Sequence, residues 1–235
     1  MEVLSFQNTK GGVGKTTLCY AVGTYLATTG KKVLFIDLDP QETLTRYLEE
    51  SELDYTENVY EVLSEKIPIS AAIQNAENFD YVPGNLRTQK LFAGVSQHQI
   101  QSEIETIKDK YDYILLDCSP SLNSITYSAF QASDTLMMPY KSSKGDMDST
   151  LFTVEEATKI NKSLRIIAIL NCYRKTQREE IFLDAIPDGI EKTTFPNLTI
   201  LPGFVDTGDS FELKRNLPIK EATAKLVDDV LGVFY

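Results

Sequence analysis

Short apolar runs alternate along the chain with stretches whose apolar residues recur at helical spacing. The runs that predict buried strands are residues 3–7, 33–37, 79–83, 113–117, 135–139, 166–171 and 198–202. The helical stripes are Leu18, Ala21, Val22, Tyr25 and Leu26, ended by Gly30; Ile100, Ile104 and Ile107; residues 151–160; and Ile219, Ala222, Leu226, Val230 and Phe234. This alternation predicts right-handed βαβ crossovers. We therefore expect an α/β fold with a mainly parallel twisted sheet and helices on both faces.

The length of the chain, 235 residues, is compatible with one large domain or two small ones. No repeat and no low-complexity linker divides it, so we expect a single domain over residues 1–235. No apolar run approaches the roughly 20 residues of a membrane-spanning helix. The chain enters its first strand at once, and we expect no signal or transit peptide.

The three cysteines are far apart and odd in number, which argues against a disulfide framework. The net charge of −11 argues against simple nucleic-acid binding. That charge is uneven. Residues 1–158 carry 12 basic and 23 acidic side chains, whereas residues 159–225 carry 11 basic and 9 acidic ones. The later part is therefore the better candidate for contact with an anionic partner.

A glycine-rich loop, residues 8–17 (NTKGGVGKTT), follows the first predicted strand and opens the first predicted helix. In this context Gly11, Gly12 and Gly14 allow backbone N–H groups to turn towards phosphate oxygens, and the helix N-terminus favours the same charge. Lys15 would reach the β- and γ-phosphates, and the hydroxyl of Thr16 would bind Mg²⁺. We call residues 8–17 the phosphate loop.

The phosphate loop departs from the common pattern G-x-x-x-x-G-K-[ST] in two ways. Thr9 stands where the pattern has its first glycine, and a second lysine, Lys10, lies inside the loop. Two ammonium groups in one tight loop repel each other. The repulsion is relieved if a polyanion binds between them, or if one of the two lysines acts in the site of a partner subunit.

Carboxylates follow the second and fourth predicted strands. Asp37 and Asp117 end these strands, and Asp39 follows Asp37 by two residues. Ligands of parallel sheets bind at the carboxyl ends of strands, where such carboxylates would hold Mg²⁺ directly or through water. Capping of the next helix is the alternative role for each.

The KGGVGKTT segment resembles the deviant Walker A motif of the ParA/MinD family of P-loop ATPases. Residues 36–41 (IDLDPQ) resemble the second motif of that family, and residues 115–121 (LLDCSPS) resemble its Walker B and switch II segment. The order and spacing agree over residues 2–171. Because the first strand begins at residue 3, the resemblance is closest to small ParA-type partition ATPases without an N-terminal DNA-binding extension.

This resemblance implies a P-loop NTPase fold, the cofactors ATP and Mg²⁺, and a homodimer formed on ATP binding. It implies catalytic roles for Lys10, which would cross to the partner's phosphates, for Lys15, and for Asp39, which would orient the attacking water. Thr16, Asp37 and Asp117 would serve the metal. The implied nucleotide-binding residues are Lys10, Gly11, Gly12, Val13, Gly14, Lys15, Thr16, Thr17 and Asn171, the last beside the adenine.

The resemblance further implies slow hydrolysis stimulated by a ParB-like adaptor, and non-specific DNA binding through phosphate contacts. The candidate DNA-binding residues are Arg174, Lys175, Lys214, Arg215 and Lys220; ordinary exposed cations are the alternative. We expect a cytoplasmic protein, associated with DNA or the nucleoid, that moves or positions a cargo which the motifs do not name.

Other functional classes remain open from the sequence. A MinD-like membrane positioner would need a basic amphipathic C-terminal helix, but the last ten residues contain two aspartates and no lysine or arginine. An iron–sulfur carrier would need cysteines grouped between subunits. A small-molecule kinase or ligase would turn over a metabolite without an adaptor, and a nucleotide-gated scaffold would not hydrolyse ATP.

Overall fold

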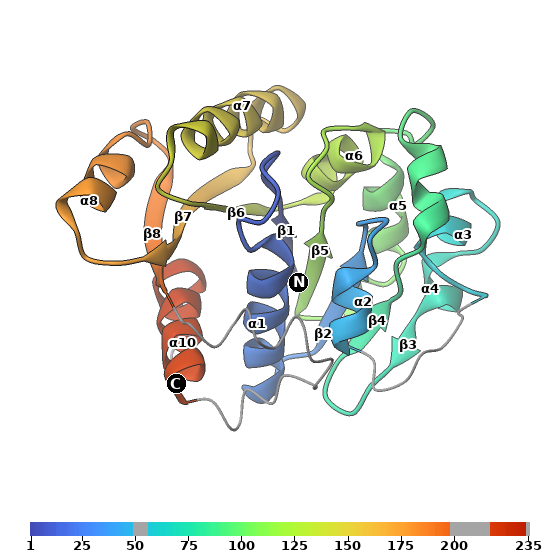
Figure 1. Ribbon diagram of the computed structural model, residues 1–235. Coiled ribbons are helices and arrows are strands. Elements are labelled where there is room, and N and C mark those ends of the chain that lie inside the picture. The colour runs from blue at the N-terminus through green and yellow to red at the C-terminus, as the bar shows by residue number, and fades with distance from the viewer. Residues whose placement is uncertain (49–55, 198–216, 234–235) are drawn as a thin grey trace.

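An eight-stranded sheet lies between two layers of helices in the computed structural model, which describes residues 1–48, 56–197 and 217–233 (Figure 1). The strand order is β3-β4-β2-β5-β1-β6-β7-β8, and every neighbouring pair is parallel except β3 with β4. The strands are β1 (Glu2–Phe6), β2 (Val33–Asp37), β3 (Gln74–Asn75), β4 (Asp80–Val82), β5 (Tyr113–Asp117), β6 (Thr135–Tyr140), β7 (Arg165–Tyr173) and β8 (Glu191–Pro196).

Helices connect the strands and cover both faces of the sheet. They are α1 (Lys15–Thr28), α2 (Thr43–Leu48), α3 (Val59–Leu63), α4 (Ile69–Ala72), η1 (Leu86–Leu91), α5 (Gln99–Glu105), η2 (Lys108–Lys110), α6 (Ser124–Ala132), α7 (Lys144–Ile160), α8 (Gln177–Asp184) and α10 (Leu217–Leu231). Among the described residues, no helix combines the length and the apolar character needed to cross a membrane.

The core follows from the alternation of side chains along each strand. On β1, Leu4 and Phe6 pack with α1 and α10, whereas Val3 packs on the opposite face with the cluster that contains α5. β5 alternates in the same way, with Leu115 towards α1 and Leu116 towards the other layer. Continuous apolar strands are therefore required here, because both faces of the sheet are buried.

The predicted α/β fold with a mainly parallel sheet is confirmed. The structure has strands at six of the predicted positions, with ends that shift by at most two residues. The strand β8 was not predicted, because most of its side chains are polar and only Phe195 is fully buried. The short strand β3 was not predicted either. The predicted strand at residues 198–202 lies outside the described residues, as does Phe234 of the last helical stripe.

The register of the central strands brings the expected site residues to one edge of the sheet. Asp117 at the end of β5 pairs with Phe6 on one side and with Asp37 on the other. The phosphate loop leaves β1 at this edge, next to both carboxylates. The opposite edge carries the amino-terminal ends of the strands.

Candidate functional site

The backbone of the phosphate loop has the conformation that its glycines permit. Gly12 and Gly14 have φ values of +71° and +101°, in the left-handed region that L-residues with side chains avoid. Gly14 is the N-cap of α1, and it supplies no side chain to cap the helix. The first turn of α1 contains no acidic residue. The N–H groups of this helix end are therefore available to an anion.

The first half of the phosphate loop is held by α7 and the end of β6. The Asn8 amide donates to the Pro139 carbonyl at 2.9 Å and to the Thr150 hydroxyl at 3.0 Å, and its oxygen accepts from the Lys10 N–H. Thr9 donates through its N–H to the Thr153 hydroxyl. These bonds connect the loop to a helix more than 130 residues away in sequence.

The two lysines of the phosphate loop lie in different environments. The Lys15 side chain is buried, and its ammonium donates to the Lys10 carbonyl at 3.3 Å. Burial lowers the pKa of Lys15, while the nearby Asp117 and Asp39 act in the opposite direction. Lys10 is exposed, and its ammonium has no ion-pair partner in the part of the chain that the structure describes. The loop thus presents one cation inwards and one outwards.

Asp117 is fully buried at the end of β5, and neither of its carboxylate oxygens accepts a hydrogen bond from the described residues. Burial and the neighbouring Asp37 raise the pKa of Asp117 well above its usual range, and Thr16 and Lys15 oppose this rise. A buried carboxylate without donors is costly unless a cation or its bound water lies beside it. The position of Thr16 and Asp117 therefore fits a Mg²⁺ site.

Asp37 is also buried, but its oxygens are used within the chain. One oxygen accepts from the N–H of Asp39, and the other accepts from the N–H and the hydroxyl of Thr45 at 2.9 and 2.7 Å. Burial raises the pKa of Asp37 to about 7 despite these bonds. The Thr45 hydroxyl also accepts from the N–H of Gly84. Asp37 thus joins β2, α2 and the segment after β4, and a metal role for it stays a prediction.

Asp39 and Thr16 are half-buried beside the phosphate loop, as is Thr17 on the next residue of α1. One oxygen of Asp39 accepts from the N–H of Gln41. Among the described residues, no group of three or more histidine, cysteine or acidic side chains is arranged to hold a metal ion. A Mg²⁺ ion here would rely on Thr16, phosphate oxygens and water, which suits an ion that retains much of its hydration.

Asn171, expected beside the adenine, contacts the phosphate loop itself. Its Nδ2 donates to the Val13 carbonyl at 2.7 Å, and its Oδ1 accepts from the N–H of Cys172. A Cβ added to Gly14 would clash with that Nδ2. The amide is therefore committed to bracing the loop, and an adenine contact stays a prediction.

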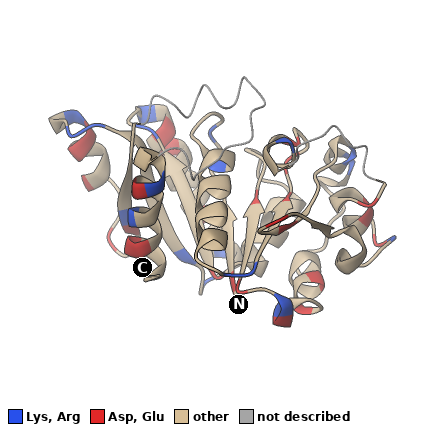
Figure 2. Ribbon diagram, turned by 90° about the horizontal axis from the view of Figure 1, so that it is seen from below, with Lys and Arg blue, Asp and Glu red and all other residues tan. Residues whose placement is uncertain are grey.

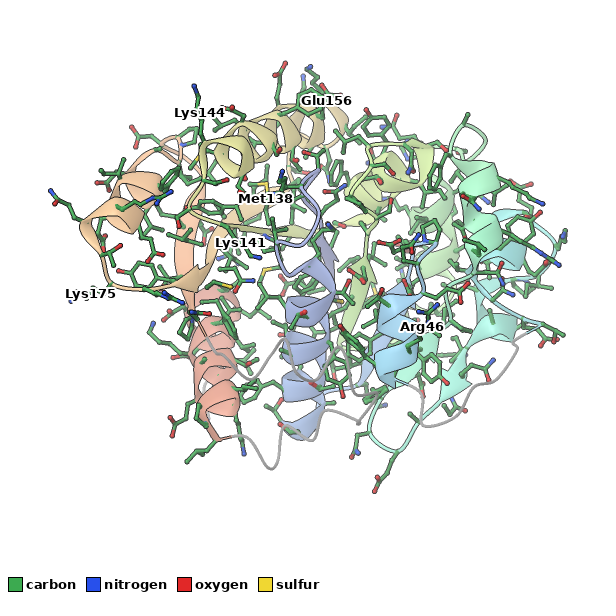
Figure 3. All side chains as sticks on the ribbon, in the orientation of Figure 1. Arg46, Met138, Lys141, Lys144, Glu156 and Lys175 are labelled. Carbon is green, nitrogen blue, oxygen red and sulfur yellow. The ribbon has the colours of Figure 1, made fainter. Side chains whose placement is uncertain are left out.

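The described basic candidates, Arg174, Lys175 and Lys220, are exposed on the side of the sheet formed by β7, α8 and α10. Figure 3 shows Lys175 pointing away from the body of the molecule. Figure 2 shows basic and acidic segments interleaved on α8 and α10. Lys214 and Arg215 lie outside the described residues. Among the described residues, no hydrogen bond or ion pair joins these cations to the phosphate loop.

The residues that brace the phosphate loop were not assigned a role from the sequence. Asn8 and Thr9 belong to the motif, but their partners Ser149, Thr150 and Thr153 lie on α7. A stripe of small polar residues at helical spacing is the only sequence signal for them. No sequence pattern indicates a role for Thr45, because its partner Asp37 is interpreted there as a metal ligand.

A glycine loop with a buried lysine at the carboxyl edge of a parallel sheet defines a P-loop nucleotide-binding protein. Residues 1–169 match the family described as AAA domain. The sporulation initiation inhibitor protein Soj of Bacillus subtilis is 29% identical over 223 residues, which are 83% of this chain and 88% of Soj. The chromosome partitioning protein ParA of Caulobacter vibrioides is 30% identical over 181 residues, 73% of this chain and 65% of that protein.

A solved structure has the same architecture over the whole chain. A putative plasmid partition protein of Borrelia burgdorferi, bound to AMPPNP, superimposes with a TM-score of 0.87 and 26% identity, and the match covers 99% of both chains. The chain belongs to the AAA-domain family of ParA-type P-loop ATPases.

Proposed function

We propose that this protein is an ATP-hydrolysing partition or positioning protein that works as an ATP-dependent sandwich dimer. The observation that carries the proposal is the contrast between the two lysines of the phosphate loop. Lys15 is buried in its own loop, whereas Lys10 is exposed and its ammonium forms no ion pair with the described residues. Soj, ParA and the Borrelia protein are named for sporulation control, chromosome partitioning and plasmid partition, which supports this function class.

Within one subunit, the phosphate loop would bind the nucleotide. The N–H groups of Gly11 to Lys15 and the start of α1 would surround the phosphates, and the Lys15 ammonium would move from the Lys10 carbonyl to phosphate oxygens. Mg²⁺, when bound, would supply positive charge to the phosphates. Thr16 and Asp117 would hold the ion, and burial would keep bulk water away from it.

Asp39 would orient the attacking water by accepting a hydrogen bond from it. This half-buried carboxylate lies close enough to Lys15 to act on its pKa, which supports a role for it near the phosphates. Orientation of water and stabilisation of the transferred phosphoryl group account for most of the catalysis in such sites.

The second subunit would complete the site with Lys10. A cation supplied in trans brings positive charge where the transition state develops it, as an arginine finger does. ATP would then join two phosphate loops face to face, and hydrolysis would weaken the contact. A ParB-like adaptor would stimulate the slow basal rate, and the dimer would bind DNA non-specifically in the cytoplasm.

The test is the variant Lys10→Ala. It should bind ATP with normal affinity but fail to form an ATP-dependent dimer in light scattering, and its turnover should fall at least about 100-fold. The control Lys162→Ala removes an exposed lysine from the opposite edge of the sheet and should behave as the wild type. A normal ATP dimer with normal turnover in Lys10→Ala would refute the proposal.

The membrane-positioner alternative finds no support in α10. Ile219, Leu226 and Val230 on this helix are buried against the sheet layer, so its apolar face is already occupied. Co-sedimentation with anionic liposomes in the presence of ATP should therefore leave the protein in the supernatant.

A further inference from the structure

A cavity of about 320 Å³ opens at the amino-terminal edge of the sheet, opposite to the phosphate loop. Its walls come from three separate segments: the loop after α1 with Lys31 and Lys32, the turn between β3 and β4, and Lys110 with Tyr111 before β5. In Figure 2 the strands run up the page, and the N-terminus, where β1 begins, lies at the lower edge of the view. Lys32 precedes β2, and Asp37 ends it, so the cavity lies about 15 Å from the nucleotide site.

Three ammonium groups at this cavity have no carboxylate partner in the described residues. Lys31, Lys32 and Lys110 form no ion pair there, whereas Lys66, Lys108 and Lys159 elsewhere each pair with a glutamate. Like charges that line one cavity without ion-pair partners repel one another, and an anion from solution relieves that repulsion.

Two of the nearby carboxylates, those of Asp80 and Asp112, accept hydrogen bonds from neutral donors. Asp80 accepts from the Tyr111 hydroxyl at 2.7 Å and from the Asn75 amide at 2.9 Å. Asp112 accepts from the backbone N–H of Lys32 at 2.8 Å. These bonds fix the walls without using the lysine side chains, which are therefore available to an external ligand as far as the described residues show.

The walls are also braced without a ligand. The ring of Phe79 packs edge-on against Phe35, with centroids 5.2 Å apart, and the N–H of Ala76 donates to the Phe79 carbonyl to close the turn. The Lys32 carbonyl accepts from the N–H groups of Asp112 and Tyr113. A preformed cavity lowers the ordering cost of binding.

We propose that this lysine cavity, lined by Lys31, Lys32 and Lys110, binds a compact polyanion with two or three negative charges, such as a phosphate ester or a tricarboxylate. The volume is at the lower end of small-ligand pockets. An extended polymer such as DNA fits less well, because the carboxylate of Glu77 lies on the wall and that of Asp112 lies beside it. The cavity shares no residue with the phosphate loop.

The test is an amide-resolved NMR titration with sodium pyrophosphate and, in parallel, with sodium citrate. Each anion that binds should cause saturable shifts of the amides of residues 31–32, 76–80 and 110–111. The double variant Lys31→Ala/Lys110→Ala should raise the dissociation constant at least about tenfold, because it removes two charge-assisted hydrogen-bond donors. The control Lys162→Ala, an exposed lysine at the same edge of the sheet, should bind as the wild type.

Any of three results would overturn the proposal that the lysine cavity binds a polyanion. They are no saturable shift at these amides with either anion, the same affinity in the double variant, and equal shifts with sodium chloride at matched ionic strength. A response to one anion alone assigns the ligand to the phosphoryl or the carboxylate class. Amides 10–17 report the phosphate loop separately, so failure here is distinguishable from failure of the proposed function.

Discussion

At the residue scale, the phosphate loop depends on backbone geometry and on where each cation points. Gly14 must have positive φ and must leave room for the Asn171 amide. Lys15 lies inwards, where Asp117 and Asp39 partly offset its burial. Lys10 remains in solvent next to it. These are properties of single positions, and single substitutions test them.

Gly14→Ala should destabilise the nucleotide-free protein by about 1–3 kcal/mol, because the added Cβ meets Asn171 and the left-handed conformation disfavours alanine. Gly11→Ala is the matched control: its Cβ would meet nothing within 4 Å, and its φ is not positive. Chemical denaturation without nucleotide measures both. An equal decrease of stability in the two variants would contradict the steric explanation.

The paired carboxylates predict a pH dependence of the nucleotide-free protein. Burial raises the pKa of Asp37 to about 7 and that of Asp117 well above its usual range. The unfolded chain therefore loses these protons at lower pH than the folded protein does. The free energy of unfolding should fall as the pH rises from about 4 to 7, by up to about 4 kcal/mol from Asp37.

Asp117→Asn removes one charge of this pair. The nucleotide-free variant should gain about 1–3 kcal/mol of stability at pH 7.5 and show a shallower pH slope, while Mg²⁺-dependent turnover is abolished. Thermal unfolding between pH 5 and 8 measures the first effect and phosphate release measures the second. The exposed Asp188→Asn serves as control and should change neither. A less stable Asp117→Asn protein would contradict the explanation.

At the scale of elements, α7 stands out as the brace of the phosphate loop (Figure 1). The helix is 17 residues long, and its Ser143 N-cap accepts from the N–H of Asp146. Thr150 and Thr153 are fully buried, and they accept from Asn8 and Thr9. Movement of α7 and of the phosphate loop should therefore be coupled.

Thr150→Val should cost about 1–3 kcal/mol of stability, because it leaves one donor of the buried Asn8 amide without its acceptor. ATP affinity should fall with it. Thr158→Val is the matched control on the same helix, since the Thr158 hydroxyl is exposed and donates only to the Val154 carbonyl. Denaturant unfolding and ATP titration of both variants test this, and equal effects would argue against a bracing role.

At the scale of the whole molecule, the net charge does not describe every region of the surface. The chain has a net charge of −11, yet Arg174, Lys175 and Lys220 are exposed together on the side of β7, α8 and α10. Acidic residues accompany them: Arg174 donates through its N–H to Glu179, and Lys225 pairs with Asp229. A DNA-binding surface here would be weak in one subunit and would gain from duplication in a dimer.

DNA binding should therefore require ATP and should weaken steeply with salt. Arg174→Ala/Lys175→Ala should reduce affinity for any DNA sequence and lower the salt slope by about 1 for each DNA phosphate that the variant no longer neutralises. The control Lys66→Ala, in the segment after α3 and already paired with Glu61, should leave both unchanged. Absence of ATP-dependent binding at low salt would reject the DNA surface.

The sequence pattern was sufficient to predict an element wherever neighbouring residues alone restrict the local structure. The glycines of the phosphate loop, the apolar strands β2 and β5 and the stripe of α1 were predicted from adjacent residues, because two buried faces or a required positive φ leave few alternatives. β8 was missed because an edge strand is polar enough to resemble a loop.

The sequence by itself determined the α/β class, the phosphate loop and the family resemblance, because these depend on residues close together in the chain. Tertiary structure alone decided which side chains meet: Asn8 with Thr150, Asn171 with Val13, Asp37 with Thr45, and the three lysines around one cavity. Such contacts join segments from separate crossovers, and their energies depend on burial and on distances that only the folded chain defines.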